Sequence, residues 1–135
     1  MKNYIGFLLL ASTILFSSFK SNFEFKDTIE IDDIVVALKA GNASNLSKYF
    51  DNRVDLSLPN KSDNYSRIQA EMIIKDFFSN NGVRNFELKH KGEKAGSNYC
   101  VGILQTRSGN YRTTLFMKSK GDKQYLQDIS FQQVQ

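Results

Sequence analysis

The amino-acid sequence predicts an α+β domain in which two to three helices pack on one face of a curved, antiparallel sheet of four to five strands. Two observations support this fold class. Apolar residues recur at helical spacing in the first half of the chain, whereas the second half alternates apolar and polar residues in runs separated by short turns. Helices and strands that are segregated along a chain pack as two layers around one core.

Two helices are predicted before the first strand. The first begins in the acid-rich segment 27–30 and ends at Gly41, which adopts the left-handed conformation of a helix end without steric cost. Its apolar stripe consists of Ile31, Ile34, Val35 and Leu38. Asn42 is expected to cap a short second helix. The apolar residues of that helix are Leu46, Tyr49 and Phe50.

A third predicted helix has the clearest pattern in the chain. Ser66 and Gln69 form a capping box at its start, and Asn80-Asn81-Gly82 ends it. Its apolar residues lie on one helix face, at the spacing i, i+3, i+4, i+7 and i+8. They are Ala70, Ile73, Ile74, Phe77 and Phe78. We expect Ile74 and Phe77 to anchor this helix on the sheet.

The remaining elements are predicted strands. Segment 54–58 alternates apolar and polar residues, and Pro59 ends it. Four further strands are expected over residues 86–90, 99–107, 111–118 and 124–132. Residues 92–98 are expected to form a polar loop, and the other two links are short glycine turns, so these four strands form an antiparallel meander. The single cysteine, Cys100, lies in a strand and is expected to be a buried, unreactive thiol.

The start of the chain predicts a signal peptide. Lys2 gives a short positive region, and residues 4–16 form an almost unbroken apolar run. This run is shorter than the roughly 20 apolar residues that a membrane-spanning helix needs. We therefore expect residues 1–21 to be removed on export to the periplasm or the outside of the cell, and residues 22–135 to form a single domain with no membrane span. An uncleaved membrane anchor is the alternative.

The charge of the chain excludes one class of function. The formal net charge is +4, but removal of the predicted signal peptide leaves 16 basic and 14 acidic residues. A nucleic-acid binder is far more basic, so nucleic acid is not an expected partner. The charge is also uneven, because residues 21–82 carry seven bases and ten acids whereas residues 83–135 carry nine bases and four acids. This asymmetry indicates either a solvated surface or a basic sheet rim that binds an anionic partner.

Several segments carry a family resemblance. They are IDDIVVALKAGNASNLSKYF, the VDLSLP that follows it, FFSNN, and YRTTLFMKSKGDKQYLQDISF. In order and pattern they resemble the nuclear transport factor 2-like superfamily, which includes SnoaL-like and ketosteroid-isomerase-like proteins. In particular, residues 28–132 resemble a family of small exported bacterial proteins with a domain of unknown function on this cystatin-like fold. The resemblance implies a cone-shaped sheet and a homodimer through the exposed sheet face, for which Tyr111 and Tyr125 supply additional apolar surface.

No catalytic residue is predicted. Isomerase-like members of that superfamily use carboxylates inside the cone. Here Asp55, Glu87 and Asp128 lie opposite the apolar side chains of their strands and are expected to face water. His90 is the single histidine and offers no metal site by itself, since zinc needs three or four ligands. The glycines are single, so no phosphate-binding loop and no cofactor are expected.

The resembled cone predicts a binding cavity. A curved sheet closed by helices leaves a cavity at its open end, with mostly apolar walls. The residues best placed to line it are Tyr49, Phe50, His90, Tyr99 and Phe131. Alternatively these side chains fill the cone completely, and function then lies on the outer surface.

The sequence therefore favours an exported, non-catalytic envelope protein that binds a small molecule or another envelope protein. The absence of inward-facing carboxylates supports this interpretation over the alternative, a small-molecule enzyme of the SnoaL-like or ketosteroid-isomerase-like kind. Neither the ligand nor the partner follows from the sequence.

Overall fold

The computed structural model describes residues 31–135, and the predicted signal peptide lies outside these residues. The described part contains three helices and six strands in one sheet. In chain order the elements are α1 (Ile31–Ala40), α2 (Ala43–Ser47), β1 (Phe50–Leu58), β2 (Lys61–Ser66), α3 (Arg67–Asn81), β3 (Val83–Lys94), β4 (Ser97–Thr106), β5 (Gly109–Lys120) and β6 (Lys123–Val134). None of the described helices is long and apolar enough to cross a membrane.

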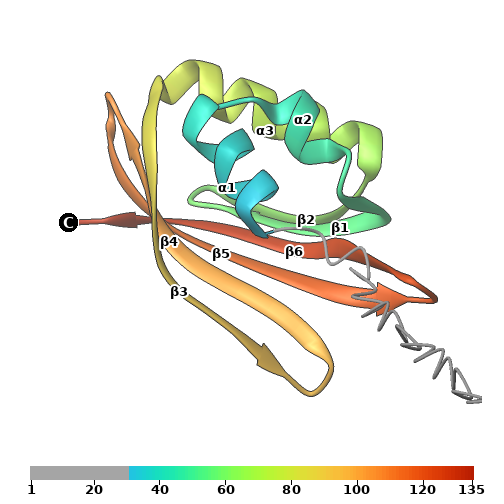
Figure 1. Ribbon diagram of the computed structural model, residues 1–135. Helices are drawn as coiled ribbons and strands as arrows, with labels where there is room; N and C mark the ends of the chain where they lie inside the picture. Colours follow the sequence, from blue (N-terminus) through green and yellow to red (C-terminus); the bar gives the residue numbers. More distant parts are fainter. Residues whose placement is uncertain (1–30) are drawn as a thin grey trace, which may run out of the picture.

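The three helices cover one face of a strongly curved sheet, as predicted (Figure 1). The strand order is β2-β1-β6-β5-β4-β3. The predicted number of four to five strands was too low, because β2 is polar and largely exposed and therefore carries no alternating pattern. The prediction of a fully antiparallel sheet was also wrong at one place. The first and last strands meet in the middle of the sheet, where β1 and β6 pair in parallel.

The predicted start of the first helix at residues 27–30 lies outside the described residues, and the other helix boundaries follow the predicted capping residues with one exception. The Ser66 side chain accepts from the backbone N–H of Gln69, and the Gln69 side chain accepts from that of Ser66, so the capping box is confirmed. Gly41 and Gly82 have φ values of 61° and 69°, the left-handed region expected of helix ends. The short helix α2 ends at Ser47, so Tyr49 and Phe50 lie outside it, and Phe50 begins β1 instead.

The predicted loop at residues 92–98 is a hairpin instead. Strand β3 continues to Lys94, and β4 starts at Ser97. Between them Ala95 and Gly96 both have positive φ values, 52° and 77°, which is the backbone of a two-residue turn that follows the twist of the strands. The polar composition of this segment therefore reflects an exposed hairpin tip that extends beyond the helices (Figure 1).

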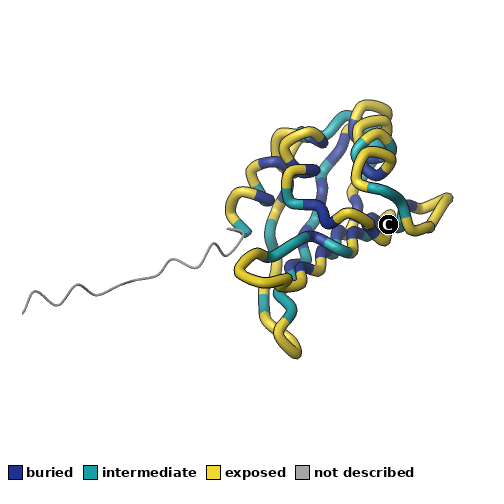
Figure 2. Tube along the Cα trace, turned by 90° about the vertical axis from the view of Figure 1, so that its right-hand side faces the viewer, coloured by how far each residue is buried: buried dark blue, intermediate teal, exposed yellow. Residues whose placement is uncertain are grey.

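The core lies between the helices and the sheet face that they cover. Figure 2 shows buried backbone on the facing sides of the two layers and exposed backbone on the outer turns of the helices and at the hairpin tips. Cys100 is fully buried there, as predicted, and burial raises the pKa of its thiol to about 11. Ile74 is a core anchor as predicted. Phe77 is not, because it is only half-buried at the margin of the core.

Candidate functional site

Apolar side chains pack in the interior of the cone. Phe50 and Phe131, both predicted to line a cavity, are completely buried in the core. The ring of Phe131 lies 4.9 Å from that of Phe77 and 6.0 Å from that of Phe78, measured between ring centres. Phe50 and Phe131 are therefore packing residues, in agreement with the alternative of a filled cone.

Two other predicted residues lie on the opposite side of the sheet. Alternate side chains of β4 point to opposite faces, so Tyr99 lies away from its buried neighbour Cys100. The Tyr99 hydroxyl and Nε2 of His90 are 2.9 Å apart in a hydrogen bond, and the Tyr99 ring also approaches that of Phe116, with 5.9 Å between ring centres. The Tyr99 hydroxyl lies over Gly92, 2.7 Å from where a Cβ would be.

Tyr49, the fifth predicted residue, is half-buried between α2 and β1. Burial, followed by the negative charge of Asp33, raises the pKa of its hydroxyl. The structure thus brings His90 and Tyr99 together and separates them from Phe50 and Phe131. The five residues do not surround one cavity, and a ligand-binding role for any of them stays a prediction.

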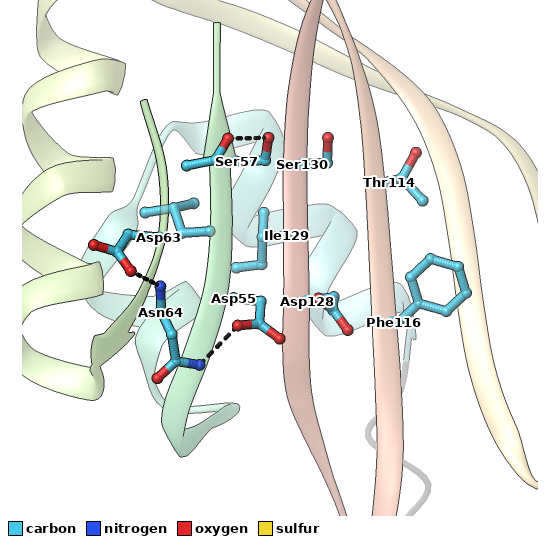
Figure 3. A pocket seen from close by; sticks show the side chains of 11 residues that line it. Asp55, Ser57, Asp63, Asn64, Thr114, Phe116, Asp128, Ile129 and Ser130 are labelled. Carbon is cyan, nitrogen blue, oxygen red and sulfur yellow. Dashed lines mark hydrogen bonds between the residues drawn. The ribbon is translucent and has the colours of Figure 1, made fainter. Parts of the chain in front are cut away.

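We call the sheet surface opposite the helices the open face. The upper part of Figure 3 shows this face with a row of hydroxyl side chains that crosses four neighbouring strands. The row consists of Ser62, Ser57, Ser130 and Thr114. The Ser57 and Ser62 hydroxyls are hydrogen bonded at 2.7 Å. Beside this row lies a shallow hollow of about 530 Å³, bounded on one side by the ring of Phe116.

An acidic pair lies in this hollow. Asp55 on β1 is in register with Asp128 on β6, and their side chains lie side by side (Figure 3). The side-chain amide of Asn64 donates to Asp55 at 2.7 Å. Partial burial raises the pKa of Asp128, and the charge of Asp55 and a hydrogen bond with it raise this pKa further. Asp55, Glu87 and Asp128 are all exposed, so their predicted orientation toward water is confirmed.

The other half of the open face is aromatic and basic. Phe116, His90 and Tyr99 form its aromatic part. Arg112 and Lys118 lie on the same side of β5 as Phe116, since they are separated from it by an even number of residues, and both are exposed. The open face thus carries its acidic pair on β1 and β6 and the bases Arg112 and Lys118 on β5.

A groove lies on the helical side of the molecule, between the C-terminal half of α3 and the turn that joins β1 and β2. It has a volume of about 500 Å³. Its apolar walls come from Leu58, Pro59, Ile73, Phe77 and Tyr111, and its polar ones from Asn60, Lys61, Asp76, Asn80 and Asn81. None of these residues was predicted to bind a ligand. The signal in the sequence was the apolar stripe of α3, which is wider than the buried part of the helix.

Within residues 31–135, no three histidine, cysteine, aspartate or glutamate side chains come close enough together to hold a metal ion. Two surfaces of the described residues carry accessible polar and apolar side chains next to a hollow or groove. These surfaces are the open face and the groove at α3.

The arrangement of helices and strands defines a cystatin-like, nuclear transport factor 2-like cone. A cystatin-like domain of unknown function from Nostoc punctiforme is 9% identical and superposes with a TM-score of 0.61 over 78% of this chain and 73% of that one. The chain described as Rd1NTF2_04 with long sheet is 14% identical, with a TM-score of 0.61 over 75% of this chain and 94% of that one. At these identities the likeness shows the fold alone.

The chain belongs to the DUF4783 family, a domain of unknown function, whose sequence pattern matches residues 31–132. The crystal structure of a DUF4783 family protein from Bacteroides uniformis is 33% identical, with a TM-score of 0.74 over 77% of this chain and 96% of that one. None of the curated proteins matches the chain. The family resemblance noted in the sequence is thereby confirmed.

Proposed function

We propose that this protein is an exported, non-catalytic interaction module whose recognition surface is the open face, and that its first partner is a second copy of the same chain. One observation carries the proposal. The residues on the helix-covered face of the sheet form the buried core, whereas no described element covers the open face.

The composition of the open face supports association. Val101, Ile103 and Tyr99 on β4 are half-buried although none of the described helices covers them, and Phe116 on β5 is 40% exposed. A large apolar side chain in the middle of an exposed surface, surrounded by polar groups, is typical of an interface. The predicted contribution of Tyr111 was wrong, because this residue is buried on the other face of the sheet.

The charges of the open face allow two copies of this face to attract each other. In a symmetric dimer, the same surface of both copies forms the interface. A two-fold axis that runs along the strands between β5 and β6 places β6 of one copy over β5 of the other. The acid Asp128 of each copy then lies level with Phe116 of the other copy, between Arg112 and Lys118 on the same side of β5. Each dimer contains this contact twice.

Paired charge reversals test the proposal. Asp55→Lys/Asp128→Lys makes the face basic on both sides, and Arg112→Glu/Lys118→Glu makes it acidic on both sides. Sedimentation velocity is expected to show dimers for the wild type, monomers for each double variant alone, and dimers again for their equimolar mixture, because both contacts of the mixed dimer join opposite charges. Arg67→Glu, on the exposed side of α3, is the matched control and is expected to stay dimeric.

Two outcomes contradict the proposal. A wild-type protein that remains monomeric at high micromolar concentration has no second copy as its partner. Variants that dimerise as well as the wild type place the interface elsewhere. Export is tested separately by N-terminal sequencing of the mature protein, which is expected to start near residue 22; an intact Met1 contradicts it.

One observation favours the alternative of a small-molecule enzyme. The raised pKa of Asp128 beside Asp55 is the kind of carboxylate pairing from which general acid–base catalysis is built. The pair lies on an open surface, however, and not in an enclosed apolar cavity that excludes water. We therefore favour the interaction module, in which the same pair supplies the acidic half of the interface.

A further inference from the structure

We infer that the groove between α3 and the β1–β2 turn is a binding site for a neutral saccharide. This site lies on the helical side of the sheet and does not depend on the open face. The inference rests on three features of the groove, which are a fixed apolar floor, a rim of unpartnered polar side chains, and a balance of charge.

The floor of the groove is held in place by a chain of hydrogen bonds. The Tyr111 hydroxyl donates to Oδ1 of Asn81 at 2.9 Å, and Nδ2 of Asn81 donates to the backbone carbonyl of Phe77 at 2.7 Å. The Phe77 and Tyr111 rings meet edge to face, with 5.0 Å between their centres. These contacts join the last turns of α3 to β5, so the floor is preorganised and needs little ordering when a ligand binds.

The apolar surface of the floor extends beyond the side chains of α3 that are buried in the core. The buried side of α3 consists of Ala70, Ile74 and Phe78, with at most 4% of each residue exposed. Phe77 and Ile73 lie next to this side on the helix and remain half-buried, facing Leu58 and Pro59 across the groove. An aromatic ring kept partly accessible at the bottom of a groove provides a surface on which the C–H groups of a sugar ring can pack.

The rim of the groove carries four polar side chains that have no side-chain partner among the described residues. They are Asn60, Lys61, Asp76 and Asn80. Among residues 31–135 none of them makes a hydrogen bond or an ion pair through its side chain, and all four are exposed. Together they present amide and ammonium donors as well as amide and carboxylate acceptors. Hydroxyl groups match such a mixed rim, because each hydroxyl both donates and accepts.

The charges of the rim balance each other. Lys61 on the β1–β2 side and Asp76 on α3 contribute one charge of each sign. A ligand with a net charge gains from one of them and is repelled by the other, whereas a neutral polyhydroxyl ligand hydrogen bonds with both. The volume of about 500 Å³ lies within the range of sites for small ligands. A neutral saccharide combines the required apolar ring faces with hydroxyl groups.

Titration of the ¹⁵N-labelled domain tests this inference. The probes are maltose, cellobiose and N,N′-diacetylchitobiose at millimolar concentrations. The dipeptide Phe-Gly is the comparison ligand, because it is a zwitterion with an aromatic ring and not a saccharide. At least one saccharide is expected to shift the amide resonances of residues 58–61 and 73–81 saturably. Asn80→Ala and Asp76→Ala, both at exposed positions, are expected to weaken that binding about fivefold or more, the effect of a lost hydrogen bond.

Two controls make the result specific. Asn85→Ala removes an exposed asparagine on β3 and is expected to leave the affinity unchanged. Asp55→Lys/Asp128→Lys is expected to bind saccharide normally even if it is monomeric, which separates this site from the proposed interface. Saturable shifts only with Phe-Gly, no saturable shift with any of the three saccharides, or equal affinities for Asn80→Ala, Asp76→Ala and Asn85→Ala would each overturn the inference.

Discussion

The two faces of the sheet are built from the same strands but have different roles. On β4, Cys100, Gly102 and Leu104 point into the core, whereas Tyr99, Val101 and Ile103 point to the open face. The inner set is completely packed and the outer set is only half-buried. Alternation along one strand therefore separates residues that stabilise the domain from residues that are available for recognition. Substitutions on the two faces are expected to differ accordingly.

Two phenylalanines provide the largest contrast. Phe131 on β6 is completely buried, whereas Phe116 on β5 is 40% exposed. Phe131→Ala leaves a cavity and is expected to lower the free energy of unfolding by about 3–5 kcal/mol. Phe116→Ala is expected to cost less than about 1 kcal/mol in the monomer but to abolish dimerisation. Urea denaturation with sedimentation measures both effects, and a Phe116→Ala protein as unstable as Phe131→Ala contradicts the assignment of the two faces.

Two strand glycines give the next contrast. A Cβ at Gly102, on the inner face, would lie 2.3 Å from Cζ of Phe86 and 2.5 Å from the backbone oxygen of Glu87. Because the backbone cannot give way, Gly102→Ala is expected to cost about 1–3 kcal/mol. At Gly92 the nearest atom is the hydroxyl of Tyr99, the movable end of a side chain. Gly92→Ala is therefore expected to be milder, and equal shifts in melting temperature for the two variants would contradict this explanation.

Two aspartates respond to pH in opposite directions. Asp51 is buried, and although burial alone raises its pKa, the Lys120 ammonium at 2.7 Å, the Gln127 amide and the Asn52 N–H lower it overall. Its ionised form therefore stabilises the fold above the ordinary aspartate pKa, and this contribution is lost as the pH falls through the lowered value. Asp51→Asn is expected to destabilise by roughly 1–3 kcal/mol at pH 7 and by less in acid.

The pH dependence of stability expected from Asp128 runs in the opposite direction. Its pKa in the folded protein is raised, so the stability linked to its protonated form is present below the ordinary aspartate pKa and is lost as the pH rises through the raised value. Asp128→Asn is therefore expected to raise the melting temperature of the monomer slightly at pH 7 and to have no effect at the acid end. Thermal melts from pH 3 to pH 8 compare both variants, and parallel curves would rule out this assignment.

The sequence predicted most of the fold because its strongest signals are local. The capping box at Ser66 and the apolar spacing of α3 fixed that helix, and the alternation of β4, β5 and β6 fixed the meander. Strand β2 was missed because an exposed edge strand without buried side chains has no alternation to detect. Its pairing with β1, and the parallel contact of β1 with β6, depend on packing between distant segments.

The site was harder to predict than the fold. The predicted lining combined Tyr49 and Phe50 from the short second helix with His90, Tyr99 and Phe131 from the strands. Which face each one occupies depends on details that a pattern does not contain. The bulge between Leu88 and His90 is one of them, since it places His90 in register with Val101 on the open face. The groove at α3 was not predicted because every apolar residue of the α3 stripe was expected to be buried in the core.

The smallest effect concerns the reactivity of two adjacent positions on β4. The Cys100 thiol is completely buried and its pKa is raised to about 11, so the reactive thiolate is scarce at pH 8 and the reagent has no access to it. Ellman's reagent is expected to leave the wild-type protein unlabelled until it unfolds.

Val101→Cys in a Cys100→Ala background places a thiol on the open face one residue further on. This thiol is expected to react readily in the monomeric Asp55→Lys/Asp128→Lys variant, and more slowly when both aspartates are retained, because the partner copy then covers it. Equal labelling rates in the two backgrounds would show that the open face stays uncovered in solution. Rapid labelling of Cys100 in the folded wild-type protein would show that the inner face is not closed.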